Sequence, residues 1–321
     1  MFNRIWFWLK NSRVFTVPMS IFSWLVVFIY AATQGGNVFY GILCLIGICF
    51  GQLATNLTDD YMDYKLLVKT GELQSNVKSK CEYITNGEAT LEQTLRVICI
   101  YCGIAFLIGV FLFFKTGYPV IIFAVLGGIP VLTYSLISTA GFGEFAVGFV
   151  YGPVLFGGVY WTMMQKLNNE VFILASIVVM FVIAQLYTNN MLDYDGDKAT
   201  NKKTLCSRFP TKDMAAIIGY GLLFGLGYGI LIIAVILKIL PCIYLITLFT
   251  LPMAADVILS MLMFNNDKTS VPKRKLWYFP MENMKNITEK GIAPFMVRMY
   301  QTRNTMIYTS LFLCIAIIIS R

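Results

Sequence analysis

Long apolar runs separated by polar stretches make up most of the chain. A helix needs about 20 mostly apolar residues to cross a bilayer, and the runs have that length. They show no alternation of polar and apolar positions, which membrane-spanning β-strands would show. The pattern therefore predicts an all-α integral membrane protein with nine transmembrane helices, at roughly residues 14–33, 38–58, 94–114, 119–138, 144–164, 171–192, 214–238, 241–263 and 305–320.

Two segments 133 residues apart resemble each other. The second apolar run ends in GQLATNLTDDYMDYKL, residues 51–66, and the sixth ends in AQLYTNNMLDYDGDKATNKKTL, residues 184–205. Because this offset places the second run on the sixth, it predicts two four-helix pseudo-repeats and a final helix, within one transmembrane domain at 1–321. Both copies contain the same residues at Gln52 and Gln185, Leu53 and Leu186, Thr55 and Thr188, Asn56 and Asn189, Asp60 and Asp193, and Tyr61 and Tyr194.

Composition and charge agree with a membrane protein and indicate its orientation. Only 13% of the residues are charged, against about 25% in soluble domains. Lys and Arg accumulate on the cytoplasmic side of membrane proteins. With nine spans, only four of the 25 lie on the side of the C-terminus: Lys115, Lys166, Lys238 and Arg321. We expect a multi-pass protein of the inner or plasma membrane, with a cytoplasmic N-terminus and catalytic loops at 59–93 and 193–213. The net charge of +8 is then a membrane-facing rim, and nucleic acid is not an expected partner.

The polar residues of each copy recur at helical spacing. Asn56, Asp60 and Asp63 are spaced i, i+4 and i+7 and would share one helix face. Asp59 falls off this face, and Asp195 falls off the corresponding face of the second copy. That second face consists of Gln185, Asn189, Asp193 and Asp197.

These two faces predict a metal site. The helices place almost no positive charge near the four carboxylates, so the faces would repel each other unless a cation lies between them. The chain has no His, which excludes haem ligation, His-based zinc sites and Ser-His triads. Oxygen ligands favour Mg²⁺ or Ca²⁺, and Mg²⁺ takes its remaining ligands from water and phosphate. We therefore expect two Mg²⁺ ions around a diphosphate, with Asn56, Asp60, Asp63, Asn189, Asp193 and Asp197 as metal ligands and the four Asp as catalytic residues.

Basic residues follow both clusters. As a group beside four carboxylates they favour phosphate binding, although each alone fits the positive-inside rim. The candidates for binding the diphosphate are Lys78, Lys198, Lys202, Lys203 and Arg208.

At these residues the chain resembles the UbiA superfamily of membrane prenyltransferases, in particular its 1,4-dihydroxy-2-naphthoate branch. NLTDDYMDY and NNMLDYDGDKATNKKTL resemble the two Asp motifs of that branch, and YSLISTAGFGEFAVGFVYGPVLFGGVYW resembles the segment between them. RVFTVPMS, from Arg13, is similar to the start of the family's first helix. The likeness covers residues 13 to about 210. Leu192, Asn201 and Asp59 depart from the branch pattern, which usually has Arg, Gly and Asn there.

The resemblance implies a function. The expected reaction transfers a polyprenyl group from polyprenyl diphosphate to an aromatic acceptor in the bilayer, in the menaquinone pathway when the acceptor is dihydroxynaphthoate. It adds Arg13 to the diphosphate-binding set and makes Tyr134 a catalytic candidate, because its ring can stabilise an allylic cation. Glu144 and Tyr151 are candidates for binding the acceptor.

Two alternatives remain open. Another acceptor, such as a 4-hydroxybenzoate-like phenol, homogentisate or a lipid glycerol phosphate, would keep the same site. A cation-coupled transporter also combines repeats with acidic residues in the membrane. Asp256, the one acidic residue at mid-depth in a predicted span, should be essential in a transporter.

Overall fold

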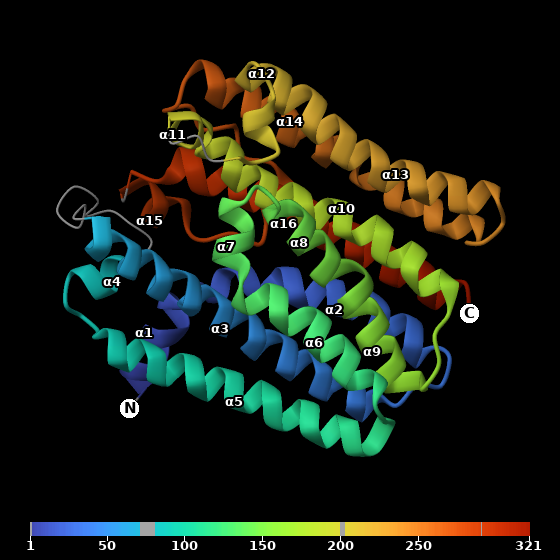
Figure 1. Cartoon of the computed structure of the whole chain (residues 1–321). Coiled ribbons are helices and arrows are strands. Elements are labelled where there is room, and N and C mark those ends of the chain that lie inside the picture. The colour runs from blue at the N-terminus through green and yellow to red at the C-terminus, as the bar shows by residue number, and fades with distance from the viewer. Residues whose placement is uncertain (1, 71–80, 200–202, 290) are drawn as a thin grey trace.

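The computed structural model describes residues 2–70, 81–199, 203–289 and 291–321, and these form helices and turns without a strand. The long helices run side by side along a bundle (Figure 1). The helices are α1 (Phe2–Asn11), α2 (Val17–Ala32), α3 (Val38–Thr70), α4 (Glu82–Thr85), α5 (Leu91–Thr116), α6 (Pro119–Leu132), α7 (Tyr134–Thr139), α8 (Gly143–Phe149), α9 (Leu155–Met164), α10 (Asn169–Leu192), α11 (Tyr194–Ala199), α12 (Lys212–Met214), α13 (Tyr220–Ile236), α14 (Leu251–Asn266), α15 (Met284–Glu289) and α16 (Ala293–Ile319).

The predicted membrane spans are confirmed, with nine as an approximate number. In the described part of the chain, eight helices are long and apolar enough to cross a membrane, and α6 is a shorter apolar helix. The predicted span 119–138 is divided at Thr133 into α6 and α7. Pro130 lies in the last turn of α6 and cannot donate its backbone hydrogen bond, which favours this early end.

Other spans contain irregular turns, among them a π-helical turn at Ala215–Gly219. Between α8 and α9 the backbone forms a π-helical turn at Val150–Val154, with Gly152 at non-helical angles followed by Pro153. Before α14, residues Cys242–Thr250 form a 3₁₀ helix. Each irregular turn changes the direction of a side chain that continuous helical spacing would place elsewhere.

The last span begins earlier than its apolar run. It was predicted from residue 305, whereas α16 begins at Ala293. Its first three turns contain Arg298, Gln301 and Asn304, which are polar yet buried. Hydropathy alone assigns such residues to a loop, but packing against neighbouring helices makes them part of the bundle.

The two halves of the chain pack in the same order. In the first half α2 contacts α3, α3 contacts α5, and α5 contacts α6; in the second, α9 contacts α10, α10 contacts α13, and α13 contacts α14. The final helix α16 packs against α2, α10 and α14. This order agrees with two four-helix units and an added helix. The main core surrounds α10.

The two termini lie at opposite ends of the bundle (Figure 1). The carboxyl ends of α3 and α10, which carry the repeated motifs, lie at the end where the N-terminus is found. The arrangement therefore places both Asp clusters at one end of the bundle.

Asp256 anchors the long segment between α14 and α16. Its carboxylate accepts hydrogen bonds from Lys275 Nζ at 2.5 Å and from Trp277 Nε1 at 3.0 Å, and Gln301 Nε2 on α16 lies at 3.3 Å. Tyr308, also on α16, donates to the carbonyl oxygen of Phe279 at 3.1 Å. The segment is thus bound to α14 and α16 at positions away from the helix ends. The buried carboxylate of Asp256 makes these contacts on α14.

Replacing Asp256 with Asn is expected to lower the apparent melting temperature of the protein in detergent. The change removes a buried charge-assisted interaction, which typically contributes about 1–3 kcal/mol, and the partly exposed Lys275 can return to water. Glu289→Gln, an exposed change on the same segment, is the control. An unchanged melting curve for Asp256→Asn would contradict the anchoring role.

Candidate active site

The first cluster lies on the last turns of α3. This helix continues to Thr70, so Asn56, Asp60 and Asp63 share one helix as their spacing predicts. The side-chain nitrogen of Asn56 donates to the carbonyl oxygen of Ser12 at 2.8 Å and to Thr16 Oγ1 at 3.2 Å. These bonds fix the amide, so that its oxygen is the atom that would face a cation.

Arg13 is the counter-charge of this cluster. It lies between α1 and α2 in a left-handed conformation, with φ of 55°. Its guanidinium forms a hydrogen-bonded ion pair with Asp60 and lies 3.6 Å from Asp59 Oδ2. This counter-charge does not come from the helices that carry the Asp residues, where almost no positive charge was expected. The sequence view considered only the helices that carry the Asp residues, whereas Arg13 arrives from a separate segment.

The second cluster follows a helix end. We expected Gln185, Asn189, Asp193 and Asp197 along one continuous face, but α10 ends at Leu192 and Asp193 forms its C-cap. A new helix, α11, carries Asp197. Asp193 is exposed and Asp197 is buried, and Thr204 Oγ1 lies 3.4 Å from Asp197 Oδ2. The break gives the two carboxylates different surroundings.

Glu144 fixes the loop that follows the second cluster. Its Oε1 accepts hydrogen bonds from Asn190 Nδ2 at 2.8 Å and from the backbone N–H of Leu205 at 2.9 Å. Gly141 packs against the same loop, because a Cβ at this position would lie 2.9 Å from Cβ of Lys203, and its φ of 88° also favours glycine. The structure thus gives Glu144, predicted to bind the acceptor, a positioning role for this loop.

Helices α7 and α8 connect the two motif-bearing helices. α7 packs against α3, α8 packs against α10, and the two short helices contact each other. Tyr134, at the start of α7, lies close enough to Asp59 and Glu144 to interact with the charges of both. Since Asp59 belongs to the first motif and Glu144 holds the second, Tyr134 lies between the two clusters. Figure 1 shows α7 in this position.

The predicted diphosphate-binding cations are only partly in the described structure. Lys78 and Lys202 lie outside the described residues. Lys198 Nζ donates to the carbonyl oxygen of Pro210 at 3.1 Å and lies over the ring of Tyr194. Lys203 and Arg208 are exposed on the loop that Glu144 holds, so both charges lie on the segment that follows the second cluster.

Tyr151 belongs to the first-motif side of the site. Its hydroxyl lies 3.2 Å from Ser20 Oγ, which donates to Gln52 Oε1 at 2.6 Å. Gln52 in turn donates to Thr16 Oγ1, which Asn56 also contacts. A chain of hydrogen bonds therefore runs from Tyr151 to the first cluster, one helical turn deeper in the bundle.

Asp195 is committed to a separate interaction, as its off-face position indicated. Lys212 and Lys268 contact its Oδ2 at 2.6 and 2.7 Å. Hydrogen bonds from these two ammonium groups hold the pKa of Asp195 below its usual value. The pairs connect α11 to α12 and to the segment after α14.

The donor set fits a divalent cation, although the described residues contain no group of three Asp, Glu, Cys or His side chains close enough to hold a metal ion by themselves. Asp60 is fully buried, and its Oδ2 has no hydrogen-bond partner. A buried carboxylate oxygen without a partner is costly, and a bound cation would satisfy it. Mg²⁺ needs only one or two protein carboxylates, which this geometry supplies.

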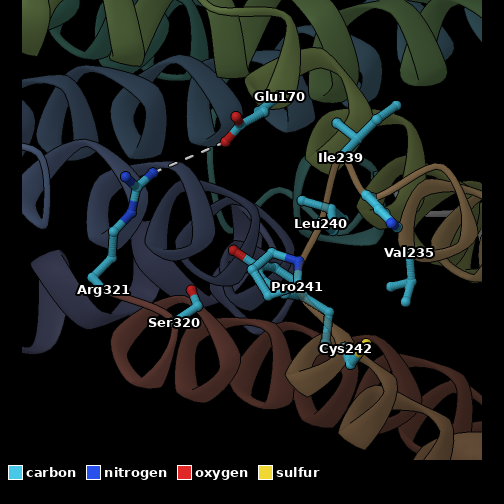
Figure 2. Close-up of a pocket in the computed structure, with 10 residues that line it drawn as sticks. Glu170, Val235, Ile239, Leu240, Pro241, Cys242, Ser320 and Arg321 are labelled. Atoms are coloured by element: carbon cyan, nitrogen blue, oxygen red, sulfur yellow. Dashed lines mark ion pairs between the residues drawn. The ribbon is translucent and has the colours of Figure 1, made fainter.

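A cavity in the described structure lies elsewhere. It has a volume of about 440 Å³ and is lined by Glu170, Lys238 and Arg321 among others, as Figure 2 shows in part. Glu170 is in the first turn of α10, whereas Asp193 follows its last residue. This cavity is therefore at the end of the bundle opposite the Asp clusters.

Several residues that build the site gave no clear signal in the sequence. Ser12 and Thr16 hold Asn56, Asn190 and Leu205 hold Glu144, and Thr204 contacts Asp197. Asn190 alone could have been found, because it stands beside Asn189 in the repeated motif. The others act through contacts between distant segments, which spacing along the chain does not reveal.

Comparisons with known proteins identify relatives of this chain. The chain matches the UbiA prenyltransferase family over residues 20–279. It is 25% identical over 213 residues to 1,4-dihydroxy-2-naphthoate octaprenyltransferase of Haemophilus influenzae, covering 63% of this chain and 68% of that one. A digeranylgeranylglyceryl phosphate synthase has the same fold, with a TM-score of 0.62 at 14% identity over 98% of this chain and 99% of its own. A UbiA homologue of Aeropyrum pernix K1 gives 0.61 at 14% identity over 94% and 97%. The chain is therefore a multi-pass membrane transferase that belongs to the UbiA prenyltransferase family.

Proposed function

We propose that this prenyltransferase transfers a polyprenyl group from polyprenyl diphosphate to 1,4-dihydroxy-2-naphthoate, in menaquinone synthesis. The acceptor is supported by the similarity to the Haemophilus influenzae enzyme and by the repeated motifs. The observation that carries the proposal is the packing of α7 and α8, which connect the first-motif helix α3 to the second-motif helix α10. This arrangement favours a single site in which both Asp clusters bind the same diphosphate.

Magnesium is the proposed cofactor. The side-chain oxygens that would hold two ions are those of Asn56, Asp60 and Asp63 from α3, with Asn189, Asp193 and Asp197 from α10 and α11. Bound Mg²⁺ would supply Lewis-acid stabilisation of the negative charge on the departing diphosphate.

The protein's own groups supply the rest of the site. Arg13 lies beside Asp60, where its guanidinium can donate two parallel hydrogen bonds to a phosphate. Lys203 and Arg208 add positive charge on the loop held by Glu144. The ring of Tyr134 would offer its negative face to an allylic cation, and such contacts are favourable in a desolvated site. These residues bind and orient the diphosphate and stabilise the cation that its departure leaves.

Glu144 and Tyr151 stay the proposed acceptor-binding residues. Glu144 accepts hydrogen bonds from Asn190 and Leu205 beside the second cluster, and Tyr151 reaches the first cluster through Ser20. Leu192 packs against the main core at the position where the branch usually has Arg. A phenol, homogentisate or lipid glycerol phosphate acceptor therefore remains the second candidate, since the diphosphate site would be the same.

The proposed orientation places both clusters in the cytoplasm of a cell whose inner or plasma membrane contains the protein. The basis is the excess of Lys and Arg at that end of the bundle. The C-terminus would then lie on the opposite side of the membrane, in agreement with its position in Figure 1.

A transporter is less well supported. Asp256 was the residue that a transport pathway should need, and the structure engages it with Lys275, Trp277 and Gln301. An acid held by a cation, an indole and an amide has a structural use. We therefore expect Asp256→Asn to keep prenyl transfer at temperatures where it remains folded.

An acceptor comparison tests the proposal. Purified protein in detergent with Mg²⁺ would receive radiolabelled farnesyl or longer diphosphates with dihydroxynaphthoate, 4-hydroxybenzoate, homogentisate, geranylgeranylglyceryl phosphate or no acceptor. The proposal expects prenylated product with dihydroxynaphthoate well above the others. Product with another acceptor alone would retain the prenyltransferase and reject the menaquinone assignment.

Asp195→Asn is expected to keep prenyl-transfer activity within a few-fold of wild type, because Asp195 faces Lys212 and Lys268 and lies away from the cluster face. Its lowered pKa contributes stability above the pKa of the unfolded chain, and this is lost as the pH falls through the folded value. The contribution is small, since the side chain is 53% exposed. Steady-state assays and melting curves at pH 7 and in acid measure both effects. A hundredfold loss of activity would place Asp195 in the site instead.

A further inference from the structure

The cavity in Figure 2 gathers charge at the end of the bundle opposite the Asp clusters. Glu170 contributes from the start of α10, Lys238 follows the end of α13, and Arg321 follows α16. Of the four basic residues predicted on this side, two therefore line one cavity, with one acidic residue. The side chains of the lining alone sum to a charge of +1, which favours an anionic group.

Glu170 and Arg321 pair with each other in the cavity, so Lys238 is the charged group that is left to bind a ligand. Tyr30 donates a hydrogen bond to Glu170, and Arg321 lies 4.0 Å from the same carboxylate and over the ring of Tyr30. Among the described residues, none forms an ion pair or side-chain hydrogen bond with Lys238, which lines the cavity with Ile239 and Leu240. An unpaired ammonium and a guanidinium that line one cavity are suitable groups for binding a phosphate.

The backbone at Lys238 shows that this side chain is held in an unusual place. Lys238 has a φ of 57°, and the N–H of Ile239 bonds to the carbonyl oxygen of Ala234 at 2.9 Å. This is a helix end at which glycine is usual, because other residues are strained there. The helix dipole favours a cation at the C-terminal end of a helix. Lys238 is at such an end and also lines the cavity.

Lipid-facing side chains surround the cavity. Ile236 and Leu237 at the end of α13, and Ile318 and Ile319 at the end of α16, are all more than half exposed. In a bilayer these apolar side chains contact acyl chains, while the charged lining lies at headgroup level. Basic pockets between membrane helices bind lipid headgroups in this way.

We propose that this cavity binds the phosphodiester headgroup of a phospholipid from the leaflet opposite the Asp clusters, with Lys238 and Arg321 as the phosphate-binding residues. The acyl chains would lie along the apolar ends of α13 and α16. The site is separate from the prenyl-transfer site, and the proposal does not depend on the acceptor or on catalysis.

The test is a lipid-dependent melting measurement on delipidated protein in detergent. Phosphatidylglycerol is expected to raise the apparent melting temperature, whereas diacylglycerol with the same acyl chains should not. In Lys238→Gln/Arg321→Gln, half of the rise should need about tenfold or more lipid, because two charge-assisted contacts are lost. Lys166→Gln, an exposed change on the same side outside the cavity, should behave as wild type.

Two further arms keep the proposal falsifiable. Glu170→Gln keeps a hydrogen-bond acceptor for Tyr30 and removes a negative charge, so it should bind phosphatidylglycerol more tightly than wild type. Inorganic phosphate at the same concentrations should have no effect. An equal response to diacylglycerol, a full response to free phosphate, or an unchanged response in the double variant would each overturn the proposed lipid site.

Discussion

Asp60→Asn is expected to reduce kcat/KM for prenyl transfer by roughly 10²–10³-fold, the range found when one preorganised electrostatic group is removed from an active site. Asp60 is fully buried, with one oxygen on Arg13 and the other without a partner. Asn has nearly the same shape and lacks the charge. The loss therefore reports the charge and not the volume of the side chain. Steady-state assays with labelled prenyl diphosphate at saturating Mg²⁺ measure it.

The matched control for this prediction is Asp195→Asn, which removes a carboxylate from the second motif at an off-face position. Melting curves of both variants test for a folding defect. None is expected in Asp60→Asn, because Arg13 still has Asp59 at 3.6 Å. If folded Asp60→Asn had an activity within threefold of wild type, Asp60 would not be a catalytic residue.

Asp193→Asn is expected to cause a loss of similar size, although Asp193 is exposed and comes from the other half of the chain. If the two clusters hold one diphosphate, removing either should disable the same step. The Asp60→Asn/Asp193→Asn double variant should then be hardly less active than either single variant, because groups that act as a unit give strongly non-additive losses.

The double-variant cycle distinguishes one site from two. Additive losses, about 10⁴-fold or more in the double variant, would indicate that the clusters contribute independently. If Asp193→Asn had wild-type prenyl-transfer activity, the repeated Asp in the second half of the chain would have no catalytic role.

The apolar pattern predicted most of the fold because membrane spans are long and leave a strong signal. It failed where buried polar residues extend a helix, as at Arg298 and Gln301 on α16, since hydropathy counts them as loop. It also could not predict the turns at Pro130 and Gly152, which divide two spans. These breaks depend on single residues within otherwise apolar runs.

The candidate site was predictable where its residues share one helix. The face of Asn56, Asp60 and Asp63 needed only helical spacing, and the structure keeps all three on α3. The second face could not be predicted from helical spacing, because one helix ends at Leu192 and another begins at Tyr194. Arg13 opposite Asp60 was beyond spacing arguments, because the contact joins residues 47 positions apart in the chain.

The role of Glu144 shows the same limit. The sequence offered it as an acceptor-binding acid, since it stands near the start of a predicted span. Its two hydrogen bonds to Asn190 and Leu205 depend on how α8 packs against α10. Spacing along the chain does not reveal these loop contacts, and acceptor binding by Glu144 stays a prediction.

The most direct test of the account is the Mg²⁺ dependence of prenyl diphosphate conversion by the purified wild-type protein. With dihydroxynaphthoate as acceptor, product formation should be absent in EDTA, return on adding Mg²⁺, and remain absent in Asp60→Asn and Asp193→Asn at the same Mg²⁺ concentration. Conversion that proceeds equally in EDTA, or that both variants retain, would contradict a single metal-dependent diphosphate site built from the two halves of the chain.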